Sequence, residues 1–123
     1  MSFEDRKEYS RIDPTLSSVE IERIAQRVAI TGVVYCIANV NRPVVKIGWS
    51  MDAISRLAQL QTASPDRLRL AAFVPGSKDV ERGLHDLFAD IRLVGEWFHD
   101  PEGEIVAVVS ELYRSFKAKE IGL

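Results

Sequence analysis

The sequence contains one cysteine, Cys36, and no apolar run long enough to span a membrane. A single cysteine excludes a disulfide within the chain and suits a reducing compartment. The first residues, MSFEDRKE, are too highly charged for a secretory signal peptide. We therefore expect a cytoplasmic protein that makes no use of a membrane.

The sequence also lacks an excess of positive charge. Its formal net charge is −2 and its pI is about 5.7, so no overall positive field attracts nucleic acid. Any nucleic-acid partner must therefore be held by a local basic patch. With 123 residues, of which 46% are hydrophobic, the chain is typical of a single globular domain.

Turn residues and hydrophobic periodicity divide the chain into four segments. Residues 1–16 show no sustained period and are expected to form an N-terminal arm that could be mobile. Ser17 and Glu20 form a capping-box pattern, which predicts a helix over residues 17–31. Residues 32–99 form the core, and residues 100–123 form a last helix that packs on it. Asp100 and Pro101 are expected to start that helix as its N-cap and first-turn proline.

The core segment predicts an α+β domain with a small antiparallel sheet. The runs VVYCIA and VVKIGW, joined by an Asn/Pro turn, predict a β-hairpin, and alternation over residues 68–74 predicts a third strand. One helix is expected from about residue 51, capped by Ser50, and a second over residues 79–92. The sequence Glu96-Trp97-Phe98 is expected to be a short apolar piece that packs on the core.

Several polar residues stand at positions that packing alone does not explain. Lys46 and Gly48 interrupt an apolar strand, and Tyr35 lies on the neighbouring strand. Arg56 falls at the margin of the buried side of its helix, where it could contact a phosphate or simply cover apolar surface.

The helix expected over residues 79–92 adds a second set. Glu81, His85 and Arg92 project on one stripe of that helix, within about 40° of each other. A carboxylate on this stripe could bind a hard cation, or Glu81 and His85 could form an ordinary surface pair.

In order, the motifs VVYCI, KIGWS, Arg56, ERGLH and EWF resemble the GIY-YIG endonuclease superfamily. The similarity is greatest to a short phage and bacterial branch in which the second motif reads KIG. The resemblance implies a three-stranded antiparallel sheet flanked by helices. It implies that Tyr35 and Gly48 belong to the first and second motifs, and that Lys46 replaces the second tyrosine. It also implies that Arg56 is the helix arginine and Glu81 the metal-binding glutamate.

The resemblance implies a metal-dependent DNA endonuclease with one Mg²⁺ or Mn²⁺ ion at Glu81. Arg56 would bind a phosphate oxygen, and Tyr35 would orient or deprotonate the attacking water. Lys46 would lower the pKa of Tyr35, because a nearby cation stabilises the phenolate. His85 would move a proton or merely pack beside Glu81. The residues expected to contact substrate are Gly48, Arg42 and Arg92.

Two other functions stay open at this point. The fold could bind DNA without cutting it, using a patch of Arg42, Lys46, Arg67 and Arg69, although the last two could simply face solvent. It could instead be a protein-interaction module. The apolar face of the last helix could support a homodimer, and a protein partner could supply specificity.

Overall fold

The computed structural model describes residues 9–120, which form an α+β domain around one five-stranded antiparallel sheet. The strand order is β3-β1-β2-β5-β4. The strands are β1 (Val33–Asn39), β2 (Val44–Ser50), β3 (Leu68–Pro75), β4 (Arg92–Val94) and β5 (Trp97–His99). The expected antiparallel sheet and hairpin are confirmed, but the expectation of only three strands was wrong.

The two additional strands come from the segment that follows the fourth helix. That helix was expected to continue to residue 92, but α4 spans Lys78–Leu87 and a 3-10 turn, Ala89–Ile91, follows it. The chain then forms β4 and turns back as β5, which pairs with β2 through Val45 and Phe98. Because of this pairing, the apolar piece expected here is a strand that extends the sheet. Its Phe98 side chain is fully buried in the core.

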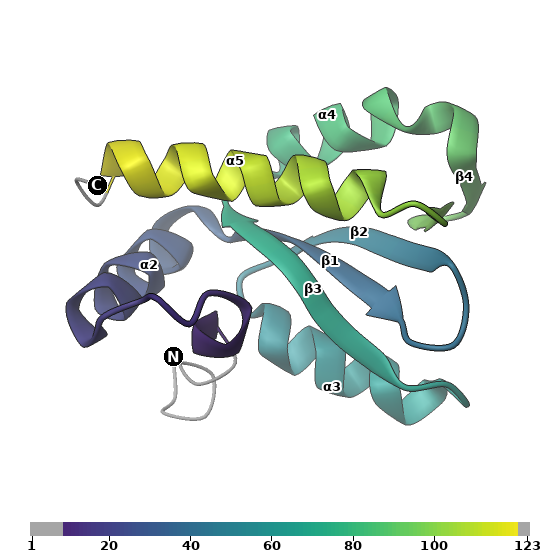
Figure 1. The fold of residues 1–123 in the computed structure, drawn as a ribbon, viewed down its shortest axis with the longest axis horizontal. Helices are drawn as coiled ribbons and strands as arrows, with labels where there is room; N and C mark the ends of the chain where they lie inside the picture. The colour runs from purple at the N-terminus through teal and green to yellow at the C-terminus, as the bar shows by residue number, and fades with distance from the viewer. Residues whose placement is uncertain (1–8, 121–123) are drawn as a thin grey trace.

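Four helices whose bounds fall inside the described range surround the sheet: α2 (Ser18–Thr31), α3 (Ala53–Ala63), α4 and α5 (Glu104–Glu120), and residues 9–12 are also helical. Figure 1 shows α3 on one side of the sheet and α4 and α5 on the other, with α2 at one end. The predicted capping box at Ser17 and Glu20 is present. The N-cap of α3 is Asp52 rather than Ser50, whose hydroxyl instead accepts a hydrogen bond from the Asp52 backbone.

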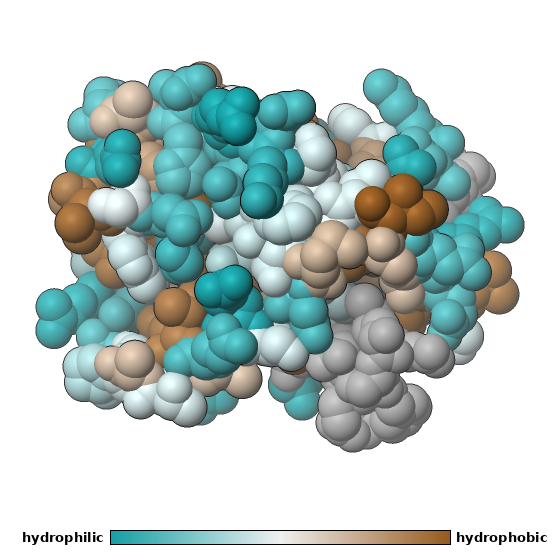
Figure 2. Space-filling view, turned by 180° about the vertical axis from the view of Figure 1, so that it is seen from behind, coloured by the Kyte–Doolittle hydropathy of each residue, from teal (hydrophilic) through white to brown (hydrophobic). Residues whose placement is uncertain are grey.

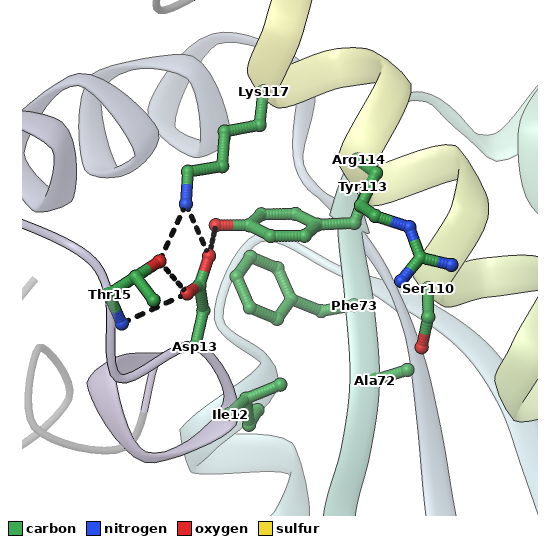
Figure 3. A pocket seen from close by; sticks show the side chains of 9 residues that line it. All are labelled: Ile12, Asp13, Thr15, Ala72, Phe73, Ser110, Tyr113, Arg114 and Lys117. Carbon is green, nitrogen blue, oxygen red and sulfur yellow. Dashed lines mark hydrogen bonds and ion pairs between the residues drawn. The ribbon is translucent and has the colours of Figure 1, made fainter. Parts of the chain in front are cut away.

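The segment expected as an N-terminal arm packs on the domain from residue 9 onward, and residues 1–8 lie outside the described part. Tyr9 is buried and its ring lies 4.4 Å from that of Phe73. Figure 3 shows Tyr113 and Lys117 of α5 reaching Asp13, and each places a donor 2.8 Å from the same carboxylate oxygen. These bonds hold the segment against α5.

The last helix begins later than expected. Asp100 is buried, and its two carboxylate oxygens accept the backbone N–H groups of Glu104 and Ile105. Pro101 therefore lies in a turn before α5 rather than in its first helical turn. Across residues 9–120, no helix combines the length and the apolar character that crossing a bilayer requires.

Candidate functional site

A pocket of about 400 Å³ opens between α3, α4 and the β1–β2 hairpin, towards the end of the hairpin that lies opposite its turn. Most of its lining comes from residues that are distant in sequence and polar in character. The lining residues are Tyr35, Lys46, Trp49, Ser50, Met51, Arg56, Leu60, Lys78, Glu81 and Glu96. The structure therefore brings together four of the expected site residues: Tyr35, Lys46, Arg56 and Glu81.

Gly48 is not among the residues that line this pocket, but it determines where the Tyr35 ring can lie. It lies directly opposite Tyr35 in the β1–β2 register. A Cβ atom at Gly48 would come 2.3 Å from the Tyr35 hydroxyl and 2.4 Å from its Cζ atom. Because real Cβ atoms do not approach other atoms so closely, only glycine lets the Tyr35 ring lie across β2 in this position.

The surroundings of Tyr35 raise the pKa of its phenol above the value that a tyrosine has in water. Burial, followed by the negative charge of Glu96, raises the pKa of Tyr35 to about 12, although Arg56 acts in the opposite direction. The expectation that Lys46 lowers this pKa was wrong. The Lys46 ammonium lies 3.3 Å from a carboxylate oxygen of Glu96, so it neutralises that group instead.

Glu96 lies in the turn between β4 and β5, and strand pairing brings it to the pocket. Its backbone oxygen accepts a hydrogen bond from Ile47, and its neighbour Trp97 pairs with Lys46. The side chain of Lys46 is only 13% exposed, whereas that of Glu96 is 41% exposed, so the ion pair joins a largely buried ammonium group to a carboxylate at the surface of the pocket.

Glu81, His85 and Glu96 form a cluster of groups that can bind a metal ion. Each offers one ligand atom, and these atoms all lie within 4.8 Å of one another. Opposite ligands of an octahedral Mg²⁺ ion lie about 4 Å apart, so small side-chain rotations would close the site around one cation. The donor set therefore fits a single divalent ion.

The position of His85 is fixed by contacts on the other side of its ring. Its Nε2 atom lies 3.0 Å from the backbone oxygen of Ile47, and its ring meets Phe98 edge-on at 5.0 Å. Because a carbonyl oxygen only accepts, Nε2 carries the hydrogen and Nδ1 keeps the lone pair that a metal requires.

The charges around Glu81 also favour the binding of a cation. Burial, and then the nearby negative charge of Glu96, raises the pKa of Glu81, while His85, Lys46 and Lys78 lower it. Two carboxylates that disfavour each other's charge gain most from a cation placed between them. Glu96 is thus the strongest candidate for a second acidic ligand.

Arg56 presents its positive charge to the mouth of the pocket. It is exposed on α3, and its guanidinium has no hydrogen bond or ion pair with any residue in the range 9–120. Such a group can donate two parallel hydrogen bonds to a phosphate.

Trp49 forms the opposite wall of the pocket. Its indole N–H lies within hydrogen-bonding distance of the backbone oxygens of Thr31 and Gly76. Its ring packs against Gly32, where an added Cβ would come within 2.5 Å of it. Lys78 lies over the ring, 4.9 Å from the centroid.

Two expected substrate-binding residues do not reach the pocket. Arg42 lies in the β1–β2 loop, where its Nε atom is 3.0 Å from Asp66. Arg92 does not share a helical stripe with Glu81 and His85, because it belongs to β4, and its Nε atom donates to the backbone oxygen of Gly95.

Among the charged and aromatic residues of the pocket, three were not anticipated as site residues: Glu96, Lys78 and Trp49. Glu96 is 50 residues away from its partner Lys46 in the sequence, and only the unexpected β5 brings them together. The EWF motif contains Glu96, but its two aromatic residues predicted a piece that packs on the core and not a part of the site.

The family model described as the T5orf172 domain matches residues 32–113. No curated protein matches the chain, and no solved structure matches it. The matched range contains β1–β5 and α3–α4, together with every residue of the pocket and of the metal-ligand cluster. The chain therefore belongs to the T5orf172 domain family, a GIY-YIG-like nuclease family.

Proposed function

We propose that the protein is a metal-dependent DNA endonuclease that hydrolyses phosphodiester bonds in this pocket. The observation that carries the proposal is the composition of the pocket. Tyr35 and Arg56 share it with the carboxylates Glu81 and Glu96, whose ligand atoms lie close to that of His85. Membership of the T5orf172 domain family supports this proposal.

The metal ligands would be Glu81, Glu96 and His85, and the ion Mg²⁺ or Mn²⁺. A divalent ion supplies charge stabilisation to the phosphate and the leaving oxygen during hydrolysis. Arg56 would bind a non-bridging oxygen of the scissile phosphate, where negative charge accumulates in the transition state. Lys46 would keep Glu96 in place until the ion is bound.

Tyr35 has a positioning role in this proposal. Its pKa of about 12 keeps the phenol protonated at neutral pH, so it cannot readily remove a proton from water. Its hydroxyl can still accept a hydrogen bond from the attacking water and donate one to the phosphate. Because Gly48 has no side chain, the ring can take the position from which both bonds would be made.

The proposal is tested by the nicking of supercoiled plasmid with Mg²⁺, with Mn²⁺ or with EDTA. Glu81→Gln should lower the rate by about 100-fold or more, the scale of losing one group that stabilises developing charge. Glu102→Gln is the matched control, because Glu102 is exposed and lies outside the pocket. Equal nicking by wild type and Glu81→Gln would disprove the metal role of Glu81.

The alternative is a DNA-binding module without cleavage. The observation that favours it is the raised pKa of Tyr35, which leaves the most prominent hydroxyl of the pocket unable to act as a strong base at neutral pH. Binding of DNA that is insensitive to EDTA, with no nicking of plasmid, branched or single-stranded DNA by the wild type, would support this alternative.

A further inference from the structure

The modest net charge of the chain conceals a strong segregation of charge. Residues 23–78 contain eight Lys and Arg residues but only two acidic residues, Asp52 and Asp66, which gives this stretch a net charge of +6. The rest of the chain contains eight basic and sixteen acidic residues, a net charge of −8. The basic stretch contains most of α2 together with β1, β2, α3 and β3, and it ends at Lys78, the first residue of α4; the rest of α4 and all of α5 lie in the acidic remainder.

Within the basic half, α3 presents an outer face without any acidic residue. Its exposed positions fall on an arc of about 160° at 100° per residue. They are Ser55, Arg56, Ala58, Gln59, Thr62 and Ala63. Five of these side chains are small or neutral, so a negatively charged polymer can approach the helix closely without repulsion.

Arginine residues stand on both sides of this face. Arg56 lies on the side that faces the pocket. Beyond the opposite side is a separate groove of about 440 Å³, where Leu57 of α3 faces Arg67 and Arg69 of the β3 segment. Within residues 9–120, the Arg67 and Arg69 guanidinium groups make no hydrogen bond or ion pair.

We propose that this surface is where the phosphate backbone of duplex DNA lies as it approaches the pocket. We call it the α3 surface, defined by the six exposed residues of α3 together with Arg67 and Arg69. The inference rests on the proposed function, because it supplies the substrate path for that site. A helix is about 10–12 Å wide. About three phosphates of one strand, spaced 3.4 Å along the axis, therefore separate Arg56 from the second groove.

The chemistry of the α3 surface favours nucleic acid over a protein partner. Protein interfaces depend on central aromatic or large apolar side chains. The large hydrophobic side chains that are exposed in the described part of the chain include none on α3. At the lower left of the face in Figure 2, where α3 lies, teal and pale residues surround a small brown patch.

The test measures the affinity of a fluorescein-labelled 20-base-pair duplex by anisotropy, in EDTA and over a series of KCl concentrations. Arg67→Gln/Arg69→Gln should weaken binding by about 10-fold and reduce the slope of log K against log salt by about two. Arg82→Gln/Arg114→Gln removes the same charge from exposed positions on α4 and α5 and should leave both quantities nearly unchanged.

A second pair of variants tests the face of α3 itself. Gln59→Glu places a negative charge in the middle of the α3 surface and should weaken binding several-fold. Gln26→Glu makes the identical change at an exposed position on α2 and should not. Because both positions are exposed, neither substitution disturbs the core, and thermal melting of each variant checks this.

The outcomes separate this proposal from the proposed function. Duplex binding with the expected losses, in a wild type that does not nick plasmid, would support the α3 surface and disprove the nuclease. Unchanged affinity and salt slope in Arg67→Gln/Arg69→Gln would overturn the α3 surface even if Mg²⁺-dependent nicking persists. A wild type that does not bind duplex DNA in EDTA, or binds only single strands, would overturn it as well.

Discussion

Replacement of Gly48 by alanine is the sharpest single perturbation that the structure suggests. The added Cβ atom would lie 2.3 Å from the Tyr35 hydroxyl, 2.4 Å from Cζ and 2.8 Å from Cε1. Ordinary contacts between such atoms are about 3.5–4.0 Å, so the ring must retreat by about 1 Å or the two strands must separate. Tyr35 is only 2% exposed, which leaves the ring little room to move.

The magnitude follows from this overlap. Overpacking of a buried position costs about 1–3 kcal/mol of unfolding free energy. For a chain of this size, that corresponds to a melting temperature lower by roughly 4–12 °C. A hydroxyl displaced by about 1 Å from its working position would also lower the cleavage rate by about 100-fold.

Thermal unfolding followed by circular dichroism, together with plasmid nicking, measures both effects. Gly83→Ala is the matched control: it adds the same methyl group inside α4, where no atom lies within 4 Å of the new Cβ. It should raise the unfolding free energy by about 0.5–1 kcal/mol, because alanine favours the helix. A Gly48→Ala protein as stable as wild type would refute the close contact between Tyr35 and β2.

Two further predictions concern stability. Burial alone would raise the pKa of Asp13, but hydrogen bonds from Lys117, Thr15 and Tyr113 lower it to about 2. The stability contributed by this carboxylate is therefore present above pH 4 and lost as the pH falls towards 2. In urea unfolding, Asp13→Asn should be roughly 1–2 kcal/mol less stable than wild type at pH 7. The difference should shrink at pH 2–3, where Asp13 of the wild type becomes protonated. Equal stability at both pH values would contradict the network in Figure 3. Asp100→Ala removes the acceptor of two backbone N–H groups at the start of α5. It should lower the free energy of unfolding by about 1–2 kcal/mol in the same assay. A loss below about 0.3 kcal/mol would contradict the role of Asp100 as the helix cap.

The parts of the fold that were predictable from sequence are those with a local physical signal. The alternating hairpin, the capping box at Ser17 and the existence of the four helices all follow from patterns within about 15 residues. The strands β4 and β5 have three residues each, which is too short for any period to show. Arg92 was therefore assigned to a helix that in fact ends at Leu87.

The candidate site divides in the same way. Tyr35, Lys46 and Gly48 lie on paired strands of one hairpin, so their proximity could be predicted from the hairpin itself. The contact of Lys46 with Glu96 depends on β5 pairing with β2, and no local pattern predicts it. The direction of the pKa shift of Tyr35 was wrong for the same reason. Lys46 forms an ion pair with Glu96, and burial is the largest cause of the raised pKa of Tyr35.

The positions of the two tryptophans give the protein a built-in optical probe. The chain contains only Trp49 and Trp97, and both are half-buried beside the pocket. Lys78 lies 4.9 Å from the Trp49 ring centroid, and Lys46 lies 6.0 Å from that of Trp97. A ligand that draws either ammonium group away changes the field across an indole ring. The intrinsic fluorescence of the unlabelled protein therefore reports on the charges that line this pocket.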